Sequence, residues 1–207
     1  MSATIPKLVL ATANPHKVGE MREILGGLGI EVLTLADFPP MEEVEETGET
    51  LEANALLKAD AVFRHTGLPS LADDTGLEVD ALGGRPGVRS ARYAGEKASY
   101  EENVTKLLDE LRLVPDAKRS ARFRTVMALR LTQDEFILAD GVAEGRIIGE
   151  RRGAAGFGYD PVFVPSEGDG GTFAEMAPEE KNAISHRGKA IVNMVEELKR
   201  AKNQGIK

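Results

Sequence analysis

Short apolar runs alternate with stretches of helical periodicity in the first third of the chain, and this alternation restricts the fold more than any other feature. Residues 7–11 form an apolar run typical of a buried strand, and residues 31–35 form another. Asn14 is a suitable cap for an intervening helix with Pro15 at its first position. The apolar residues of this helix repeat at helical spacing, at Val18, Met21, Leu25 and Leu28. Three glycines end the helix: Gly26, Gly27 and Gly29.

The middle of the chain is richer in strands. The patterns predict an exposed loop at residues 37–50, a helix at 51–63, a strand at 68–72 that stops before Asp73, and a glycine-rich turn at 83–87. They then predict a helix at residues 99–111 and two hairpin strands at 122–131 and 135–148, joined by residues 132–134. A short strand at 162–164 and a final helix at 184–201 follow. The final helix turns Ile191, Met194, Val195 and Leu198 inward. This order predicts an α/β fold with a mixed sheet.

Composition limits the classes of function. With 207 residues, the chain suits one domain or two small lobes, and its net charge of -8 argues against a sheath on long nucleic acids. There is no cysteine, which excludes thiolate metal sites and favours a reducing compartment. Three histidines leave a hard cation on carboxylates as the expected metal. We find no apolar stretch near 18 residues and no export signal, and expect a cytoplasmic protein without membrane partners.

Positive charge stands where two predicted helices begin. Lys17 lies in the first turn of one, and His186 and Arg187 open another. Helix N-termini are already positive, so cations there suggest an anion among them, and phosphate is the usual one. For Lys17 the alternative is a solvated lysine, which costs only about 0.3–1 kcal/mol.

Carboxylates supply the complementary charge. Asp73 and Asp74 directly follow an apolar run, and we expect both at the end of a strand, where α/β proteins bind ligands. Two carboxylates near phosphates require a divalent cation, and Mg²⁺ suits one or two carboxylates with phosphate oxygens and water. The alternative is that one carboxylate caps a turn and the other faces solvent. The acidic run at residues 42–46 is either a solvated loop or part of the site, and Lys58 either reaches the site or extends to solvent.

Residues 156–161 form the most unusual local sequence, in which Phe157 and Tyr159 alternate with glycines before Asp160. One interpretation is a tight turn that places Phe157 in the core. The other is a base pocket, where an aromatic ring stacks on a heterocycle. Lys181, His186 and Arg187 bring three donors nearby in sequence. Arg187 is suited to a phosphate or a base carbonyl, and His186 to a purine oxygen.

Seven stretches, in order along nearly the whole chain, together resemble the inosine triphosphate pyrophosphatase family. They are residues 12–17, 46–48 together with 52–55, 71–77, 81–87, 90–93, 157–161 and 181–187. The resemblance implies an elongated α/β fold with a mixed sheet flanked by helices, two lobes with a central cleft, and a homodimer. It implies one pyrophosphatase domain over residues 1–207. It also implies Mg²⁺-dependent hydrolysis of purine nucleoside triphosphates (ITP, dITP, XTP) to the monophosphate and pyrophosphate.

The same resemblance assigns roles by position. Asp74 is implied as metal ligand or general base, with either Glu45 or Glu46 as a second ligand, and Thr75 touches substrate. The triphosphate would be bound by Thr12, Ala13, Asn14, Pro15, His16 and Lys17. The nucleotide would be bound by Phe157, Gly158, Tyr159, Asp160, Lys181, His186 and Arg187.

Residue chemistry and resemblance lead to one hypothesis. Asp74 or a neighbouring carboxylate takes a proton from water as it attacks the α-phosphorus, while Lys17, Lys58, Lys181 and Arg187 stabilise the charge that develops. A hydrogen-bond donor such as His186 or Arg187 would pair with a 6-keto purine and reject ATP, which has an amino group there. GTP shares the 6-keto group, so its rejection must come from contacts at the 2-position of the purine. One alternative is a phosphatase acting through an aspartyl-phosphate, but such enzymes need two aspartates separated by one residue, and Asp73 and Asp74 are adjacent. The other is a nucleotide sensor without turnover.

Overall fold

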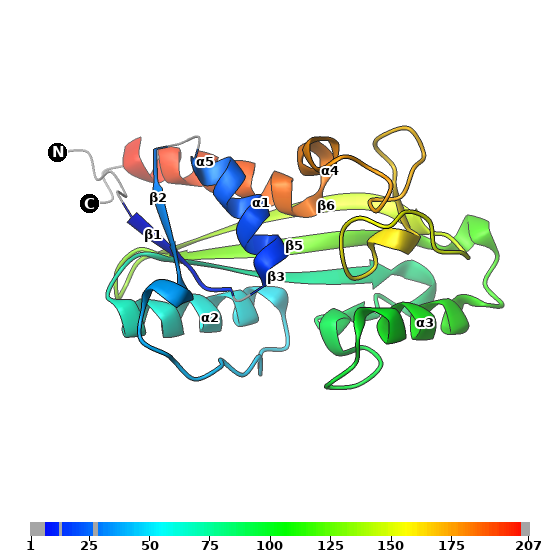
Figure 1. The fold of residues 1–207 in the computed structure, drawn as a ribbon, viewed down its shortest axis with the longest axis horizontal. Coiled ribbons are helices and arrows are strands. Elements are labelled where there is room, and N and C mark those ends of the chain that lie inside the picture. The colour runs from blue at the N-terminus through cyan, green and yellow to red at the C-terminus, as the bar shows by residue number, and fades with distance from the viewer. Residues whose placement is uncertain (1–6, 13, 27–28, 204–207) are drawn as a thin grey trace. The chain divides into compact units, whose positions relative to one another are not determined.

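One mixed β-sheet organises the protein (Figure 1). The computed structural model describes residues 7–12, 14–26 and 29–203. In these ranges seven strands follow the order β2-β1-β3-β5-β6-β7, with β4 paired to β3. β1 is parallel to β2 and β3, whereas the β3–β4 and β6–β7 pairs are antiparallel, which confirms the mixed sheet. The strands are β1 Lys7–Leu10, β2 Glu31–Thr34, β3 Ser70–Val79, β4 Pro86–Gly87, β5 Ser120–Arg130, β6 Phe136–Ile147 and β7 Phe163–Pro165.

Five α-helices accompany the sheet in the described residues: α1 Pro15–Gly26, α2 Leu51–Thr66, α3 Tyr100–Leu111, α4 Pro178–Ile184 and α5 His186–Asn203. Their ends follow local chemistry. Thr50 caps α2 by accepting a hydrogen bond from the Ala53 N–H, and Gly67 ends it in the left-handed conformation at φ 68°. Ser99 and Glu102 form a capping box at the start of α3. No helix among the described residues is both long and apolar enough to cross a membrane.

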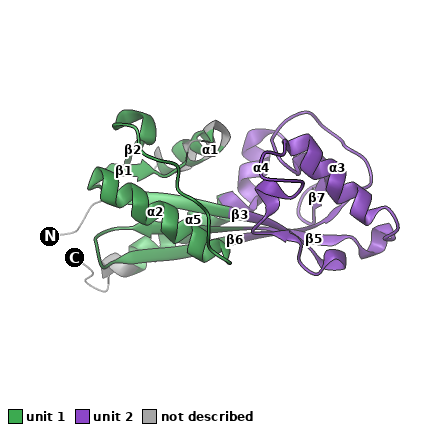
Figure 2. Ribbon diagram, turned by 90° about the horizontal axis from the view of Figure 1, so that it is seen from below, with its two compact units in different colours: residues 1–74, 125–141, 188–207 green, residues 75–124, 142–187 purple. Residues whose placement is uncertain are grey.

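The chain forms two compact units (Figure 2). Unit 1 comprises residues 1–74, 125–141 and 188–207, and unit 2 comprises residues 75–124 and 142–187. The boundaries fall inside β3, β5, β6 and α5, so each of these elements contributes residues to both units.

In unit 1, α1 and α5 cover one face of the strands and α2 covers the other (Figure 1). Leu8, Leu10 and Leu71 of the strands share a buried cluster with Met21 of α1 and Met194 of α5. On the opposite face, α2 buries an apolar stripe that consists of Leu51, Ala55, Ala59 and Val62. The periodicity that predicted these helices therefore identified their buried faces.

Unit 2 has a core of its own. α3 contributes Leu107 and Leu111, which pack with Leu77 of β3 and with the rings of Phe123 and Phe163. The Phe123 and Phe163 rings meet edge to face, with centroids 4.8 Å apart. This arrangement is a favourable one for aromatic pairs.

Three sequence-based predictions need correction. β3 does not stop at residue 72 but continues to Val79, because Leu77 and Val79 are buried and β4 pairs with this part of the strand. Consequently residues 86–87 form a short strand and are not part of a simple turn. The predicted final helix is present as α5 but begins at His186 and not at residue 184, since Ser185 has an extended backbone (φ −71°, ψ 155°) that ends α4, a helix that the sequence patterns did not predict.

Candidate active site

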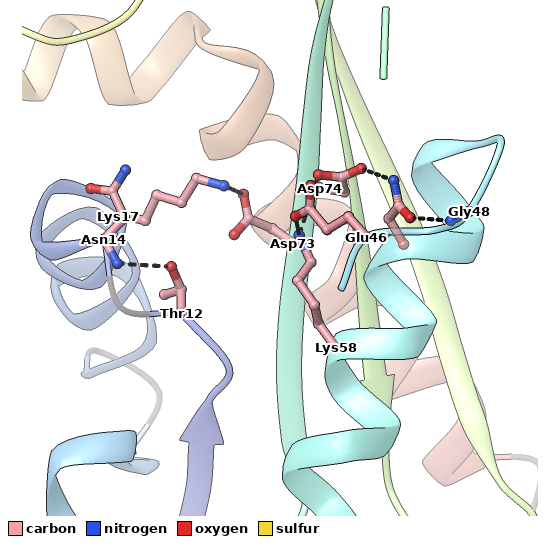
Figure 3. Close-up of polar contacts among 9 residues, drawn as sticks. Thr12, Asn14, Lys17, Glu46, Gly48, Lys58, Asp73 and Asp74 are labelled. Atoms are coloured by element: carbon pink, nitrogen blue, oxygen red, sulfur yellow. Dashed lines mark hydrogen bonds and ion pairs between the residues drawn. The ribbon is translucent and has the colours of Figure 1, made fainter. Parts of the chain in front are cut away.

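β3 carries two adjacent carboxylates to opposite faces of the sheet. Successive side chains of a strand alternate in direction, so Asp73 points to the face covered by α1 and Asp74 to the face covered by α2. Lys17 Nζ lies 2.8 Å from Asp73 Oδ2, and Lys58 Nζ lies 3.2 Å from Asp74 Oδ1 (Figure 3). The expectation that both carboxylates follow the end of a strand is therefore wrong: they lie inside β3.

Thr12 and Asn14 make hydrogen bonds between β1 and the start of α1. Thr12 Oγ1 accepts a hydrogen bond from the Asn14 N–H at 3.2 Å, and Asn14 O accepts one from the Val18 N–H at 3.1 Å. Pro15 and His16 are the first two residues of α1, whereas Ala13 lies outside the described residues. The Lys17 side chain is only 17% exposed, so it extends toward Asp73 and not into solvent.

Lys58 reaches two carboxylates, which decides between its two interpretations. Its ammonium donates to Glu46 Oε1 at 2.8 Å and to Asp74 Oδ1 at 3.2 Å. Glu46 is half-buried, whereas Glu45 is exposed. Of the two glutamates left open by the sequence, Glu46 is therefore the one whose carboxylate shares a lysine with Asp74. This part of the acidic run is a component of the cluster and not only a solvated loop.

Sequence reasoning gave Asn54 no role in the site. This residue is completely buried on α2, where its Nδ2 donates to Asp74 Oδ2 at 3.1 Å and its Oδ1 accepts from the Gly48 N–H at 2.8 Å. A signal was present, since Asn54 stands at helical spacing from Leu51 within the apolar stripe of α2. A polar residue on a buried helix face must find hydrogen-bond partners there.

The electrostatics of this cluster favour a proton acceptor. Burial raises the pKa of Asp74, and the Glu46 carboxylate raises it further, whereas Lys58 and the Asn54 hydrogen bond lower it; the net shift is upward. Burial lowers the pKa of Lys58, but Asp74, Asp73 and Glu46 together outweigh it, so that this pKa is raised. An ionised Asp74 held beside a protonated lysine is suited to accept a proton from water.

The cluster also suits a hard divalent cation. Among the described residues, no group of three or more His, Asp or Glu side chains is gathered as a complete metal site. Mg²⁺ does not require one, because it usually takes one or two carboxylates and completes its shell with water and phosphate oxygens. Asp74 and Glu46 provide two oxygen donors within 3.2 Å of one ammonium, and their mutual repulsion would be relieved by a divalent ion.

Unit 2 holds a second cluster built around Asp160. Asp160 Oδ2 accepts from Lys181 Nζ at 2.9 Å and from the Phe157 N–H at 2.8 Å. Lys181 Nζ and Arg187 Cζ lie 5.2 and 5.5 Å from the centroid of the Phe157 ring. Asp160, Lys181 and Arg187 are all buried, and burial raises the pKa of Asp160 against the opposing effect of Lys181.

The loop that carries Phe157 depends on Gly156. Gly156 has φ +74°, and a Cβ built on it would lie 2.2 Å from Asp160 Oδ2, so a larger residue would displace the carboxylate. This contact explains why a glycine stands directly before Phe157.

The two aromatic residues of this loop have different environments. Phe157 is half-buried beside its cations, so the interpretation that placed it in the core is wrong. Tyr159 is the core residue: it is 4% exposed, and its hydroxyl donates to Ser90 O at 2.9 Å. Tyr100, at the start of α3, was missed by the sequence reasoning, and its ring centroid lies 6.0 Å from that of Phe157.

The remaining predicted residues of unit 2 are His186, Gly158 and Thr75. His186 is buried and stacks on Phe123, with ring centroids 4.6 Å apart and planes 16° from parallel. Gly158 is half-buried in the same loop as Phe157, and Thr75 is a half-buried residue of β3. In unit 1 the structure thus brings Glu46, Lys58 and Asp74 together, with Lys17 and Asp73 on the other face of β3. In unit 2 it brings Asp160, Lys181 and Arg187 together beside Phe157.

Comparison with known proteins gives these clusters a context. The family model described as "Ham1 family" matches residues 8–197, and the chain belongs to this family. A protein of Elusimicrobium minutum named dITP/XTP pyrophosphatase is 51% identical, over 93% of this chain and 100% of its own length. A protein of Geobacter sulfurreducens with the same name is 50% identical, over 93% of this chain and 96% of its own length.

Solved structures agree with this assignment. A HAM1 protein from Coxiella burnetii superimposes with a TM-score of 0.85 and 43% identity, covering 94% of this chain and 99% of its own. The resemblance inferred from the ordered motifs is therefore confirmed, as is the α/β fold with a mixed sheet.

Proposed function

We propose that this protein hydrolyses deaminated purine nucleoside triphosphates (dITP, ITP and XTP) to the monophosphate and pyrophosphate, with Mg²⁺ as the metal. Membership of the Ham1 family and relatives named dITP/XTP pyrophosphatase support the reaction. The observation that carries the proposal is the arrangement of Asp74 and Glu46 around Lys58. It unites a proton acceptor, two oxygen ligands and a cation, which are the groups that phosphoryl transfer needs.

Asp74 has the central role in the proposed reaction. It accepts a proton from a water molecule as the water oxygen bonds to the α-phosphorus, and the bond between the α-phosphorus and the bridging oxygen breaks to release pyrophosphate. Asp74 and Glu46 would hold Mg²⁺, which when bound polarises phosphate oxygens and lowers the pKa of water. Glu45 is exposed, so the structure favours Glu46 as the second ligand.

The lysines act on the charge of the triphosphate. Lys58 stands beside Asp74, and Lys17 extends from the first turn of α1, where backbone N–H groups also favour phosphate. We assign the triphosphate to residues 12–17 and to Lys58. Their positive charge would stabilise the pyrophosphate as it leaves.

The cluster of unit 2 is assigned to the base. The side chains of Lys181 and Arg187 carry hydrogen-bond donors but no acceptor atoms, so they suit the 6-oxo group of hypoxanthine or xanthine and not the 6-amino group of adenine. The half-buried Phe157 ring offers a surface for stacking. A site built around donors rejects a base that brings another donor, because the buried donor would lose its partner.

A nucleotide panel with Mg²⁺ tests the proposed function. We expect turnover of dITP, ITP and XTP well above ATP and GTP, with pyrophosphate as the product. Orthophosphate as the first product would instead support a phosphatase, and tight nucleotide binding without product would support a sensor.

Replacement of one carboxylate tests the role of Asp74. Asp74→Asn keeps the shape of the side chain but removes the proton acceptor, and we expect kcat to fall by roughly a thousandfold or more. Asp134→Asn is the matched control, because Asp134 is exposed in the connection between β5 and β6. Near-normal turnover by folded Asp74→Asn would contradict the assignment.

Four further expectations from the sequence are kept as part of the proposal. They are a homodimer, a cytoplasmic location, the absence of nucleic acid and membrane partners, and one functional domain across residues 1–207. The family model supports the last of these, because its match at residues 8–197 includes both compact units. Light scattering during size-exclusion chromatography would measure the oligomeric state.

A further inference from the structure

Asn54 uses both ends of its amide group within the cluster of unit 1. It is fully buried, and a buried amide is costly unless its polar atoms are hydrogen-bonded. Its Nδ2 donates to Asp74 Oδ2 at 3.1 Å, and its Oδ1 accepts from the Gly48 N–H at 2.8 Å (Figure 3). One side chain of α2 therefore connects β3 to the acidic loop at residues 41–50.

These contacts close a ring. Asp74 Oδ1, the oxygen that does not face Asn54, lies 3.2 Å from Lys58 Nζ, and the same nitrogen lies 2.8 Å from Glu46 Oε1. Glu46 in turn precedes Gly48 by two residues. The orientation of the Asp74 carboxylate and the position of Glu46 are thus fixed twice, once through Lys58 and once through Asn54.

The contact between the loop and Asn54 is too close for any side chain at position 48. A Cβ built on Gly48 would lie 2.6 Å from Asn54 Oδ1 and 2.8 Å from Ala53 Cβ. These atoms belong to α2, which cannot move aside easily because Leu51 and Ala55 are buried beside them. Gly48 is therefore a second position, besides Glu46, where the loop is attached to α2.

The acidic loop at residues 41–50 requires contacts of this kind to be ordered. Glu42, Glu43, Glu45 and Glu49 are exposed in it, and their like charges favour an extended, solvated chain. Ordering a loop also costs conformational entropy. Without the contact at Gly48, the Glu46 carboxylate would be positioned by the Lys58 ion pair alone.

We propose that Asn54 is a positioning residue of the active site, whose amide group holds Asp74 and the Glu46 loop in the one arrangement that presents both carboxylates to a single divalent cation. The inference rests on the proposed function for the identity of the reaction. The hydrogen bonds themselves do not depend on it. Residues that orient metal ligands in this way commonly contribute about 10–100-fold to metal affinity or activity.

Three variants separate this role from a structural one. Asn54→Ala removes both hydrogen bonds, and Gly48→Ala displaces the loop while leaving Asn54 and Asp74 unchanged. The control is Asn103→Ala. Asn103 is also a buried helical asparagine that bridges to a loop, with its Oδ1 accepting from the Ala94 N–H at 2.7 Å and its Nδ2 donating to Ala91 O at 3.0 Å.

Four quantities are measured for each variant: kcat for dITP, the Mg²⁺ concentration for half-maximal activity, the rise in Tm caused by Mg²⁺ without nucleotide, and hydrogen exchange of residues 46–50 without metal. For Asn54→Ala we expect kcat to fall about 10–100-fold, a higher Mg²⁺ requirement, a smaller Mg²⁺-induced rise in Tm and faster exchange. For Gly48→Ala we expect about a tenfold higher Mg²⁺ requirement and faster exchange. Asn103→Ala should lower Tm yet keep kcat and the Mg²⁺ requirement within about twofold.

A folded Asn54→Ala protein with normal kcat and a normal Mg²⁺ requirement would overturn the inference, whatever its Tm. If this variant does not fold, Gly48→Ala decides: an unchanged Mg²⁺ requirement and unchanged exchange would reject the role. Absence of pyrophosphate formation by the unmodified protein would instead reject the proposed function. In that case the Mg²⁺-induced rise in Tm and the exchange rates still test the positioning role.

Discussion

At the scale of single residues, Lys58 neutralises two carboxylates of unit 1. Its side chain is 15% exposed and contacts the carboxylates of both Glu46 and Asp74. Removal of its charge would leave two carboxylates facing each other in a partly desolvated place. Each such loss of a buried partner costs about 1–3 kcal/mol.

We therefore expect Lys58→Met to lower the free energy of unfolding of the metal-free protein by about 1–3 kcal/mol near neutral pH. The folded-state pKa of Lys58 is raised above 10.5, so its stabilising effect is complete below that pH and is lost as pH rises through the folded-state pKa. The difference between the unmodified protein and Lys58→Met should shrink accordingly in strongly alkaline buffer. Urea unfolding in EDTA from pH 7 to 11.5 measures it.

Lys7→Met provides the comparison for this experiment. Lys7 pairs with Glu31 at 3.1 Å, but both side chains are about half exposed, and such pairs contribute only about 0–1 kcal/mol. Equal effects of the two substitutions near neutral pH would show that Lys58 is an ordinary surface lysine.

At the scale of secondary structure elements, β3 determines how the charges are divided. Because Asp73 and Asp74 are neighbours in a strand, one faces α1 with Lys17 and the other faces α2 with Lys58 (Figure 3). The Asp73 side chain is fully buried against Lys17. We expect this ion pair to hold the first turn of α1 against the sheet.

Double-mutant cycles test this division. Lys17→Met and Asp73→Asn should show a coupling energy of about 0.5–3 kcal/mol, because the two side chains are in contact. Lys17→Met and Glu46→Gln should be additive within about 0.3–0.5 kcal/mol, because they lie on different faces of β3. The free energies come from urea unfolding without metal. Coupling of similar size in both cycles would contradict the division.

At the scale of the whole molecule, two hydrophobic cores are connected by continuous elements. The boundary between the units crosses β3, β5, β6 and α5. β3, for example, pairs with β1 in unit 1 and with β4 in unit 2. Loss of one core should therefore remove the support for strands that continue into the other.

We expect Leu129→Ala, in the core of unit 1, to lower the free energy of unfolding by about 2–5 kcal/mol. All three tyrosines lie in unit 2 and the chain has no tryptophan, so tyrosine fluorescence reports on unit 2 alone. The urea midpoints from fluorescence and from far-UV circular dichroism should decrease together. Leu113→Ala is the control, since Leu113 is 87% exposed. A fluorescence midpoint unaffected by Leu129→Ala would show that the units unfold independently.

Much of the fold and part of the site were accessible from the sequence. The helices expected at residues 51–63 and 99–111 are present as α2 and α3, since their patterns depend on neighbours along the chain. Lys17, Asp74 and Lys58 were recognised from local patterns and from the family resemblance, and the structure brings Asp74 and Lys58 into contact. By contrast, Tyr159 and Phe157 had to be distinguished by the structure, because alternation in a short loop does not show which ring meets the core.

The sequence by itself determined the order of the elements, the mixed sheet and the chemical types of the site, because periodicity, capping and motif order are properties of neighbouring residues. Only the tertiary structure decided the length of β3, the choice of Glu46 over Glu45 as the partner of Lys58, and the place of Asn54. The physical reason is distance along the chain. Asn54 meets Asp74 across 20 residues, and Lys58 meets Glu46 across 12, so these contacts exist only after α2, β3 and the acidic loop have packed together.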